Sequence, residues 1–587
     1  MMNKFKKWLA LGLSALMLTG TMSAFAGCGG DGPDGSAGGD ESFVEETDPK
    51  RTQLYVRNYK GGFGNKWLYT AKDKLEAQYA GQSLEPGKTG VQVKIEDIKE
   101  APDVSGIPND IYDVYFAESL YYLQLVKQGV VEDITDVVTG TNSYEPNKLI
   151  KDKMTAEQQA YFGYPEADGA HYYAIPHYVT SLGFIYDIDR FNEKGYYFVK
   201  GYENETELAN KFIVDDSDKK SAGPDGTEGT DDDGLPATYD DFFDLCQFIL
   251  DSGDTPFNWG AKSARYYQGT LIHQLMADYQ GKDQFMLNAT FDGTMDELVK
   301  FDENGEIVYK SDGSIATESV TIDPTWTADK KGNGYDVYRH ISYYYALDFV
   351  HRLVDNTSKY GVAGKTDTTS YTAFDAQDDY VLSRHIGKRQ VMLLDGTWWD
   401  SESTGAFDEA ITYYGDKAKK ENCNYGWLPM PKATRAQVAK KVKPTLLNGA
   451  DSLCFIKTGL PDWKKELAKN FIRILHTDEA LVDFTVKTNA FKNLQYEVPD
   501  SVVATLSPFG KMLHENLKKY DVVNVYHANE QSYATTYLIA LSRRFSISQN
   551  DLFPTDVFQT QEMSTAEYFK KTNQYVRTSI WPGAPAL

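Results

Sequence analysis

The sequence predicts an α/β protein, because strands and helices alternate from its first folded residues onward. Residues 52–59 (TQLYVRNY) and 91–98 (VQVKIEDI) alternate apolar and polar side chains, as half-buried strands do. Between them, residues 65–80 carry apolar side chains at helical spacing. A short apolar strand over 111–117 and a helix that ends at Gly129 follow. This order is typical of an α/β lobe, and a chain of 587 residues is long enough for two or more such lobes.

The first 50 residues predict secretion and a tether. A basic start, an apolar run over 8–18 and small residues up to Ala26 are typical of a secretory signal peptide over 1–27. Cys28 resembles the lipidated cysteine of the bacterial lipobox, although Phe25 departs from the leucine usual in that pattern. We therefore expect a lipid anchor that holds the protein at a membrane without crossing it. The alternative is a soluble secreted protein with a stray cysteine. Residues 28–50, rich in glycine and acidic side chains, predict a flexible tether.

Composition narrows the class of protein further. A formal net charge of −25 makes nucleic acid or an anionic membrane surface a poor partner. Beyond Cys28 only Cys246, Cys423 and Cys454 remain, in no CxxC spacing, so we expect neither a disulfide framework nor a zinc site. The chain holds 41 Tyr against 29 Phe, and tyrosine suits either a half-wet ligand surface or the rim of a core.

The acidic loop over 214–236 is the one candidate for an ion. Carboxylates close in sequence, with glycines for tight turns, suit calcium, and their spacing selects Asp225, Asp231 and Asp233. The EF-hand pattern fails because Lys220 stands where a third ligand belongs. The alternative is a solvated acidic loop. No other cofactor is expected.

Residues 171–195 (HYYAIPHYVTSLGFIYDIDRFNEKG) carry a resemblance to a known family. They are similar to the first interlobe crossing of extracellular solute-binding proteins (family 1) of bacterial ABC importers, in their oligosaccharide-binding group. The matching positions are Tyr173-Ala174-Ile175-Pro176, Gly183, Tyr186-Asp187, Phe191 and Gly195. Later landmarks keep the family's order, including VMLLDGTWWD at 391–400 and YGWLPMPK at 425–432.

The resemblance implies a fold and a partner. The fold is the periplasmic-binding-protein-like type II architecture, with two lobes around a ligand cleft joined by a hinge of three crossings. We place lobe one at 51–178 plus 446–495 and lobe two at 179–445 plus 496–587. Residues 285–322, with Asn-Gly and Asp-Gly turns, predict an inserted pair of hairpins in lobe two. The family implies a monomer at the extracellular face of the cytoplasmic membrane that delivers an oligosaccharide to the transmembrane subunits of an ABC permease.

The resemblance also implies the binding residues. A sugar offers an apolar ring face and a rim of hydroxyls, so its site needs flat aromatic rings and polar side chains. The Gly-x-Trp turn puts Trp398 in a stacking position, and Trp399 either packs behind it or extends the platform. Thr180 stands where the family often has a carboxylate. The remaining candidates are Tyr59, Phe63, Phe116, Glu118 and Tyr178 from lobe one and its crossing, and Trp259, Tyr266, Tyr267, Tyr533 and Tyr537 from lobe two.

Three other functions stay open at this point. A glycan-adhesion lipoprotein and a peptide-binding receptor of the same fold would each use the same architecture. A glycoside hydrolase would need two carboxylates about 5–10 Å apart across the cleft. The sequence shows no nucleophile elbow, HExxH, Walker or dinucleotide-binding motif, so we expect a binding protein and no enzyme.

Overall fold

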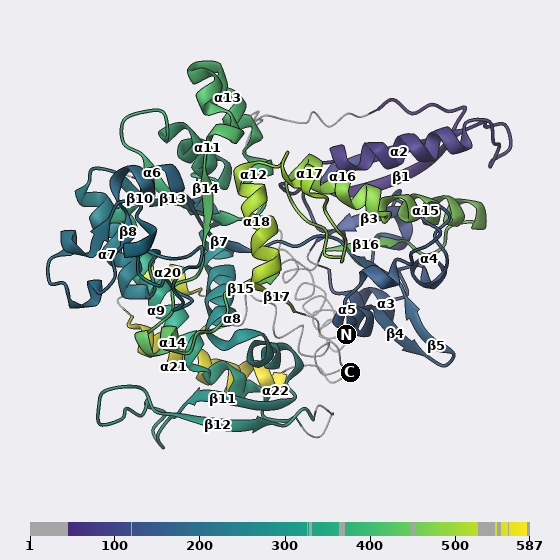
Figure 1. The fold of residues 1–587 in the computed structure, drawn as a ribbon. Helices are drawn as coiled ribbons and strands as arrows, with labels where there is room; N and C mark the ends of the chain where they lie inside the picture. The colour runs from purple at the N-terminus through teal and green to yellow at the C-terminus, as the bar shows by residue number, and fades with distance from the viewer. Residues whose placement is uncertain are drawn as a thin grey trace, which may run out of the picture.

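The computed structural model describes residues 45–118, 120–325, 327, 331–362, 370–448, 452–525, 546–548, 553–560 and 563–583 (Figure 1). The predicted signal peptide, Cys28, most of the tether, Tyr533 and Tyr537 lie outside these residues. Within them, every helix is too short or too polar to cross a lipid bilayer.

Lobe one is built on a five-stranded sheet in the order β2-β1-β3-β16-β6. Its central strands are parallel, and β16 runs antiparallel to both of its neighbours. Leu54 and Val56 of β1 are fully buried, as the alternation predicts. The strands are β1 (Thr52–Tyr59), β2 (Val91–Ile98), β3 (Val114–Ala117), β6 (Ile175–Pro176) and β16 (Leu453–Ile456).

Helices from both ends of the chain cover this sheet. Helix α2 (Lys66–Tyr79) packs against α15 (Asp462–Leu475) and α16 (Asp478–Thr488), which come from almost 400 residues later (Figure 1). The lobe also holds α3 (Tyr122–Lys127), α4 (Thr135–Thr139), α5 (Ala156–Phe162), β4 (Gly163–Glu166) and β5 (Gly169–Tyr172).

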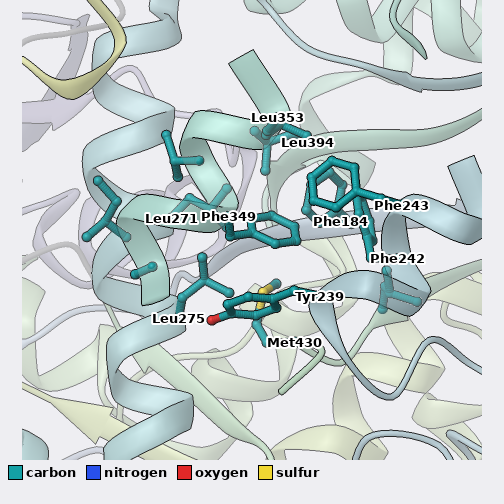
Figure 2. Packing of buried hydrophobic residues seen from close by; sticks show 14 of the residues in the cluster. Phe184, Tyr239, Phe242, Phe243, Leu271, Leu275, Phe349, Leu353, Leu394 and Met430 are labelled. Atoms are coloured by element: carbon teal, nitrogen blue, oxygen red, sulfur yellow. The ribbon is translucent and has the colours of Figure 1, made fainter. Parts of the chain in front are cut away.

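Lobe two is built on a four-stranded sheet in the order β10-β13-β7-β14. Strands β7 and β13 are buried along their whole length, which is why they read as nearly continuous apolar runs. Figure 2 shows Phe184 of β7 among aromatic rings of the covering helices, with ring centroids 4.9 Å from Phe242. The strands are β7 (Leu182–Asp187), β10 (Thr255–Asn258), β13 (Gln390–Gly396) and β14 (Tyr425–Leu428).

Many helices surround this second sheet. Helix α7 begins at Tyr239 because the side chains and backbone N–H groups of Thr238 and Asp241 cap each other. The helices are α6 (Ile188–Lys194), α7 (Tyr239–Asp251), α8 (Ala264–Thr290, kinked at Gly281), α9 (Ile341–Asp355), α10 (Thr357–Tyr360), α11 (Ala373–Ser383), α12 (Trp399–Glu402), α13 (Thr404–Tyr414), α14 (Arg435–Ala439), α17 (Asp500–Val503), α18 (Pro508–Lys519), α20 (Pro554–Thr560), α21 (Thr565–Tyr575) and α22 (Trp581–Gly583). Short strand pairs are β8 (Tyr197–Phe198) with β9 (Phe212–Ile213), and β15 (Thr445–Asn448) with β17 (Asp521–Asn524).

The predicted hairpin insertion is right only from residue 293 onward. Strands β11 (Gly293–Val299) and β12 (Thr317–Ile322) pair antiparallel, and Gly305 and Gly313 adopt positive φ in the turns between them. Residues 285–290 are instead the end of α8. Phe285 and Ala289, four residues apart, share a buried face there, so helical packing decides their conformation.

Three segments connect the two sheets and lie side by side. The His177 N–H donates to Ser452 O at 3.0 Å, and the Val179 N–H donates to Phe491 O at 3.1 Å. Lys492 forms an isolated bridge with Tyr178. The chain therefore passes between the lobes through segments that are hydrogen-bonded to one another, while the exact lobe boundaries stay a prediction.

Candidate functional site

The two lobes meet where the loop after β1 contacts the start of α12. A Cβ atom at Gly62 would lie 2.9 Å from the Trp398 Cβ and 3.2 Å from the Glu402 Cβ. Only glycine leaves room for this approach. The half-buried Trp398 packs against the buried apolar clusters of both lobes. We call the contact of Gly61 and Gly62 with Trp398 and Glu402, together with the side chains around it, the seam.

The glycine two residues before Trp398 leaves the space that its indole ring occupies. A Cβ atom at Gly396 would lie 2.0 Å from the Trp398 Cζ3, so the indole ring lies directly over the Gly396 backbone. This close approach explains the Gly-x-Trp spacing: any other residue at 396 would push the ring out of place.

The lobe-one wall of the seam is a carboxylate held by two phenols. Glu118 follows β3 and accepts hydrogen bonds from the hydroxyls of Tyr178 and Tyr59. The Tyr178 ring meets Phe63 edge-on, with centroids 4.9 Å apart. A Cβ atom at Gly61 would lie 3.0 Å from the Tyr59 ring, so this wall adjoins the glycine loop.

The lobe-two wall holds two carboxylates joined by one amide. Gln377 of α11 donates through Nε2 to Asp395 Oδ2 at 2.9 Å and to Glu402 Oε2 at 2.8 Å. Asp395 also accepts the Gly396 N–H at 2.7 Å and the Tyr267 hydroxyl at 3.4 Å. The neutral amide of Gln377 therefore donates hydrogen bonds to both carboxylates.

Burial raises the pKa of all three acids, and the charge of Glu402 adds to the shift at Glu118 and Asp395. Burial, with a smaller contribution from the charge of Glu402, raises the pKa of Glu118 to about 7, although the hydrogen bonds from the two tyrosine hydroxyls lower it. Burial and Glu402 likewise raise the pKa of Asp395 to about 7. Burial also raises the pKa of Glu402, against a lowering by Gln377 and by the charge of Lys99. Glu118 and Glu402 come from different lobes, so their interaction crosses the seam.

Comparison with solved structures shows which fold this is. No family model matches the sequence, and no curated relative does. A structure described as a chitin oligosaccharide binding protein matches with a TM-score of 0.53 at 14% identity, over 91% of this chain and 100% of that one. RafE from Streptococcus pneumoniae in its apo form gives a TM-score of 0.48 at 12% identity, over 90% and 98% of the two chains. This chain has the two-lobed type II fold of solute-binding proteins. The fold class predicted from the sequence is confirmed.

Several predicted residues lie in or beside the seam of this fold. Glu118, Tyr59, Tyr178, Phe63 and Trp398 are brought together there. Their contact with a ligand stays a prediction.

Other predicted residues lie in the lobe cores. Trp399 has no exposed surface and meets Tyr425 edge-on at 5.0 Å and Phe509 at 5.5 Å, so in this arrangement it offers no platform. Trp399 belongs to a buried cluster of lobe two that also contains Tyr425 and Phe509. Phe116 is buried edge-on against Trp67 at 4.9 Å. Thr180 and Trp259 are also buried, whereas the buried Tyr267 reaches the seam through its hydroxyl bond to Asp395. Tyr266 lies in α8 with a side chain outside the described part.

The acidic loop does not gather the three aspartates predicted for calcium. Asp231 turns outward and pairs with Lys519. The buried Asp232 instead accepts the Asp225 N–H at 3.0 Å. Asp233 accepts the Gly229 N–H at 2.7 Å. Adjacent side chains in a run of aspartates point in different directions, and sequence spacing did not show which one faces inward.

A different set of ligating atoms does converge. Across the described ranges, the only three acidic, histidine or cysteine side chains with ligating atoms within 4.8 Å of one another are Glu166, Asp168 and His171. The His171 ring already lies between Asp133, at 2.7 Å, and Asp168, at 3.0 Å. The three side chains lie on the β4–β5 hairpin, and the hydrogen bonds of His171 account for their closeness without a metal ion.

Half of the seam has no counterpart among the residues predicted from the sequence. Asp395 and Glu402 stand on either side of the tryptophan pair, and an acid that ends a buried apolar strand was a usable signal. Nothing in the sequence marks Gln377, because its role depends on α11 lying beside β13.

Proposed function

We propose that this protein is a binding protein that captures an oligosaccharide between its two lobes and delivers it to an ABC permease. The observation that carries the proposal is the position of Trp398: a half-buried indole at the seam, in contact with both lobes, with carboxylates and phenols around it. An aromatic face beside hydrogen-bonding groups is what a sugar requires. The likeness in fold to a chitin oligosaccharide binding protein supports the same ligand class.

The mechanism is closure around the ligand. An open form admits the saccharide, and closure completes contacts from both walls, so the ligand favours the closed form by the free energy of those contacts. The permease then recognises the closed form, and the binding protein itself performs no chemistry. Lipidation of Cys28 would keep it at the extracellular face of the cytoplasmic membrane.

A saccharide panel tests this function. Calorimetric titration with gluco-, galacto- and N-acetylglucosamine oligomers should find at least one ligand of micromolar or tighter affinity, and small-angle scattering should show compaction at saturation. Failure to bind any oligosaccharide would refute the proposal. Because Glu118 faces Glu402 across the seam, a glycoside hydrolase is the second candidate, and the appearance of new reducing ends on prolonged incubation would favour it.

The anchor is tested separately. Cells that express the protein should incorporate labelled palmitate into it, and Cys28→Ala should release it into the medium. If Cys28→Ala stayed in the membrane fraction as the parent protein does, Cys28 would not be the anchor. If the parent protein itself were found in the medium, it would be a soluble secreted protein.

A further inference from the structure

The seam carboxylates lack the cations that buried acids elsewhere in the chain possess. In the described residues most buried aspartates form ion pairs, as Asp278 does with Lys432 and Asp254 with Arg190. Across the same part of the chain, no ion pair involves Glu118, Asp395 or Glu402. Lys99 lowers the pKa of Glu402 through its charge, and its ammonium lies 4.4 Å over the Phe374 ring.

Gln377 gives a second, independent sign of a missing donor. Its side chain is 1% exposed, and its Nε2 is already shared between Asp395 and Glu402. Its Oε1 is buried and has no hydrogen-bond partner among the described residues. A buried amide oxygen left without a donor destabilises the folded protein. The lobe-two wall therefore presents unsatisfied acceptors in addition to its negative charge.

We propose that the ligand is cationic: an oligosaccharide of unacetylated amino sugars, with an ammonium group bound between Glu118 and Glu402. This inference rests on the proposed function. A neutral sugar hydroxyl donates one hydrogen and leaves the two charges repelling each other when the lobes close. An ammonium donates three hydrogens and carries the opposite charge, so it satisfies the acceptors and turns repulsion across the seam into attraction.

Among the side chains that the structure describes, the titratable groups that act on the three seam acids are acidic or phenolic, apart from Lys99. Lobe one contributes Glu118, Tyr59 and Tyr178, and lobe two contributes Asp395, Glu402 and Tyr267. The raised pKa values of the acids in the unliganded structure support the inference, because a bound cation would lower them again.

The test compares two ligands that differ only in charge. Glucosamine oligomers and N-acetylglucosamine oligomers of the same linkage and length are titrated calorimetrically at pH 6, where the free amines are protonated. We expect the glucosamine oligomer to bind at least about tenfold more tightly. The advantage should shrink as salt is raised and should be lost in Glu118→Gln and Glu402→Gln. The exposed Glu228→Gln makes the same charge change far from the seam and should keep the advantage.

Each outcome decides the inference. Equal or tighter binding of the neutral oligomer would overturn it while leaving the proposed function intact. Binding of neither oligomer nor of any other saccharide would overturn both. A gain in melting temperature with calcium alone, lost in Glu402→Gln, would assign the seam to a metal ion instead. Melting temperatures of the variants close to that of the parent protein confirm that they fold.

Discussion

Two regions of this molecule hold ionisable side chains of opposite sign that form no ion pair among the described residues. The seam holds the buried Asp395 and the half-buried Glu118 and Glu402. Lobe one holds Lys492, 3% exposed, in no ion pair within the described residues. Its ammonium nitrogen lies 4.0 Å from the Trp67 ring centroid and 4.4 Å from that of Phe484, and 2.6 Å from His177 Nδ1.

The two regions differ in what surrounds the charge. Aromatic rings and a histidine of one lobe enclose Lys492 completely, and burial lowers its pKa well below the ordinary value. Nothing that binds from outside reaches it, so it is part of the structure. The seam acids belong to two lobes, and whatever enters between the lobes changes their surroundings. The comparison suggests a rule for this fold: buried groups within one lobe stabilise it, and groups shared between lobes recognise a ligand.

The tryptophan pair gives the strongest test of this rule. Trp399 is enclosed within lobe two, so Trp399→Ala should lose about 3–5 kcal/mol of unfolding free energy. Chemical denaturation followed by circular dichroism measures this loss. Saccharide affinity, measured on the fraction that remains folded, should fall much less. A variant that is as stable as the parent protein would contradict the packing seen here.

Trp398→Ala should show the opposite pattern. Its indole is shared between the lobes, and removal of such an aromatic contact with a ligand often costs more than about 2 kcal/mol of binding, or about thirtyfold in affinity. Melting of the unliganded protein should change less than in Trp399→Ala. Calorimetric titration of the two variants side by side provides the comparison. Normal binding by Trp398→Ala and lost binding by Trp399→Ala would show that the two roles are reversed.

Glu118→Gln should change how stability depends on pH. The folded-state pKa of Glu118 is raised to about 7 from an ordinary value of 4.5, so the folded protein binds this proton more strongly than the unfolded chain. Stability due to this group is therefore present at low pH and lost as pH rises from about 4.5 to about 7. Relative to the parent protein, the variant should melt about 2–5 °C higher at pH 8 and nearly equally at pH 4.5. A gain that is the same at both pH values would refute a titrating Glu118.

The sequence predicts the scaffold better than the site. Strand alternation and helical spacing located β1, α2 and β2 because each pattern is local. The Gly396-x-Trp398 turn is also local, and the structure explains it by the ring lying over the glycine. The bond from Gln377 to Asp395 and Glu402 joins α11, β13 and α12, and no local pattern encodes it. The contact of Gly62 with Trp398 depends on how the two lobes approach each other, and no pattern within either lobe's sequence predicts that approach.

Lys492→Met should have the smallest effect on saccharide binding, and the pH dependence of its effect on stability should have the opposite sign to that of Glu118→Gln. Because the folded-state pKa of Lys492 is lowered, the unfolded chain binds one more proton at every pH between the lowered value and the ordinary 10.5. This group therefore destabilises the folded protein increasingly as pH falls.

Methionine keeps the length of the side chain and its contacts with Trp67 and Phe484 while it removes the amine. We expect a gain in stability that is larger at pH 5 than at pH 8, with saccharide affinity unchanged. Relative to the parent protein, the stability gained by Glu118→Gln increases as pH rises, whereas the stability gained by Lys492→Met increases as pH falls. If Lys492→Met instead weakened binding as much as Glu118→Gln, an enclosed charge within one lobe would take part in recognition, and the distinction between the two regions would be wrong.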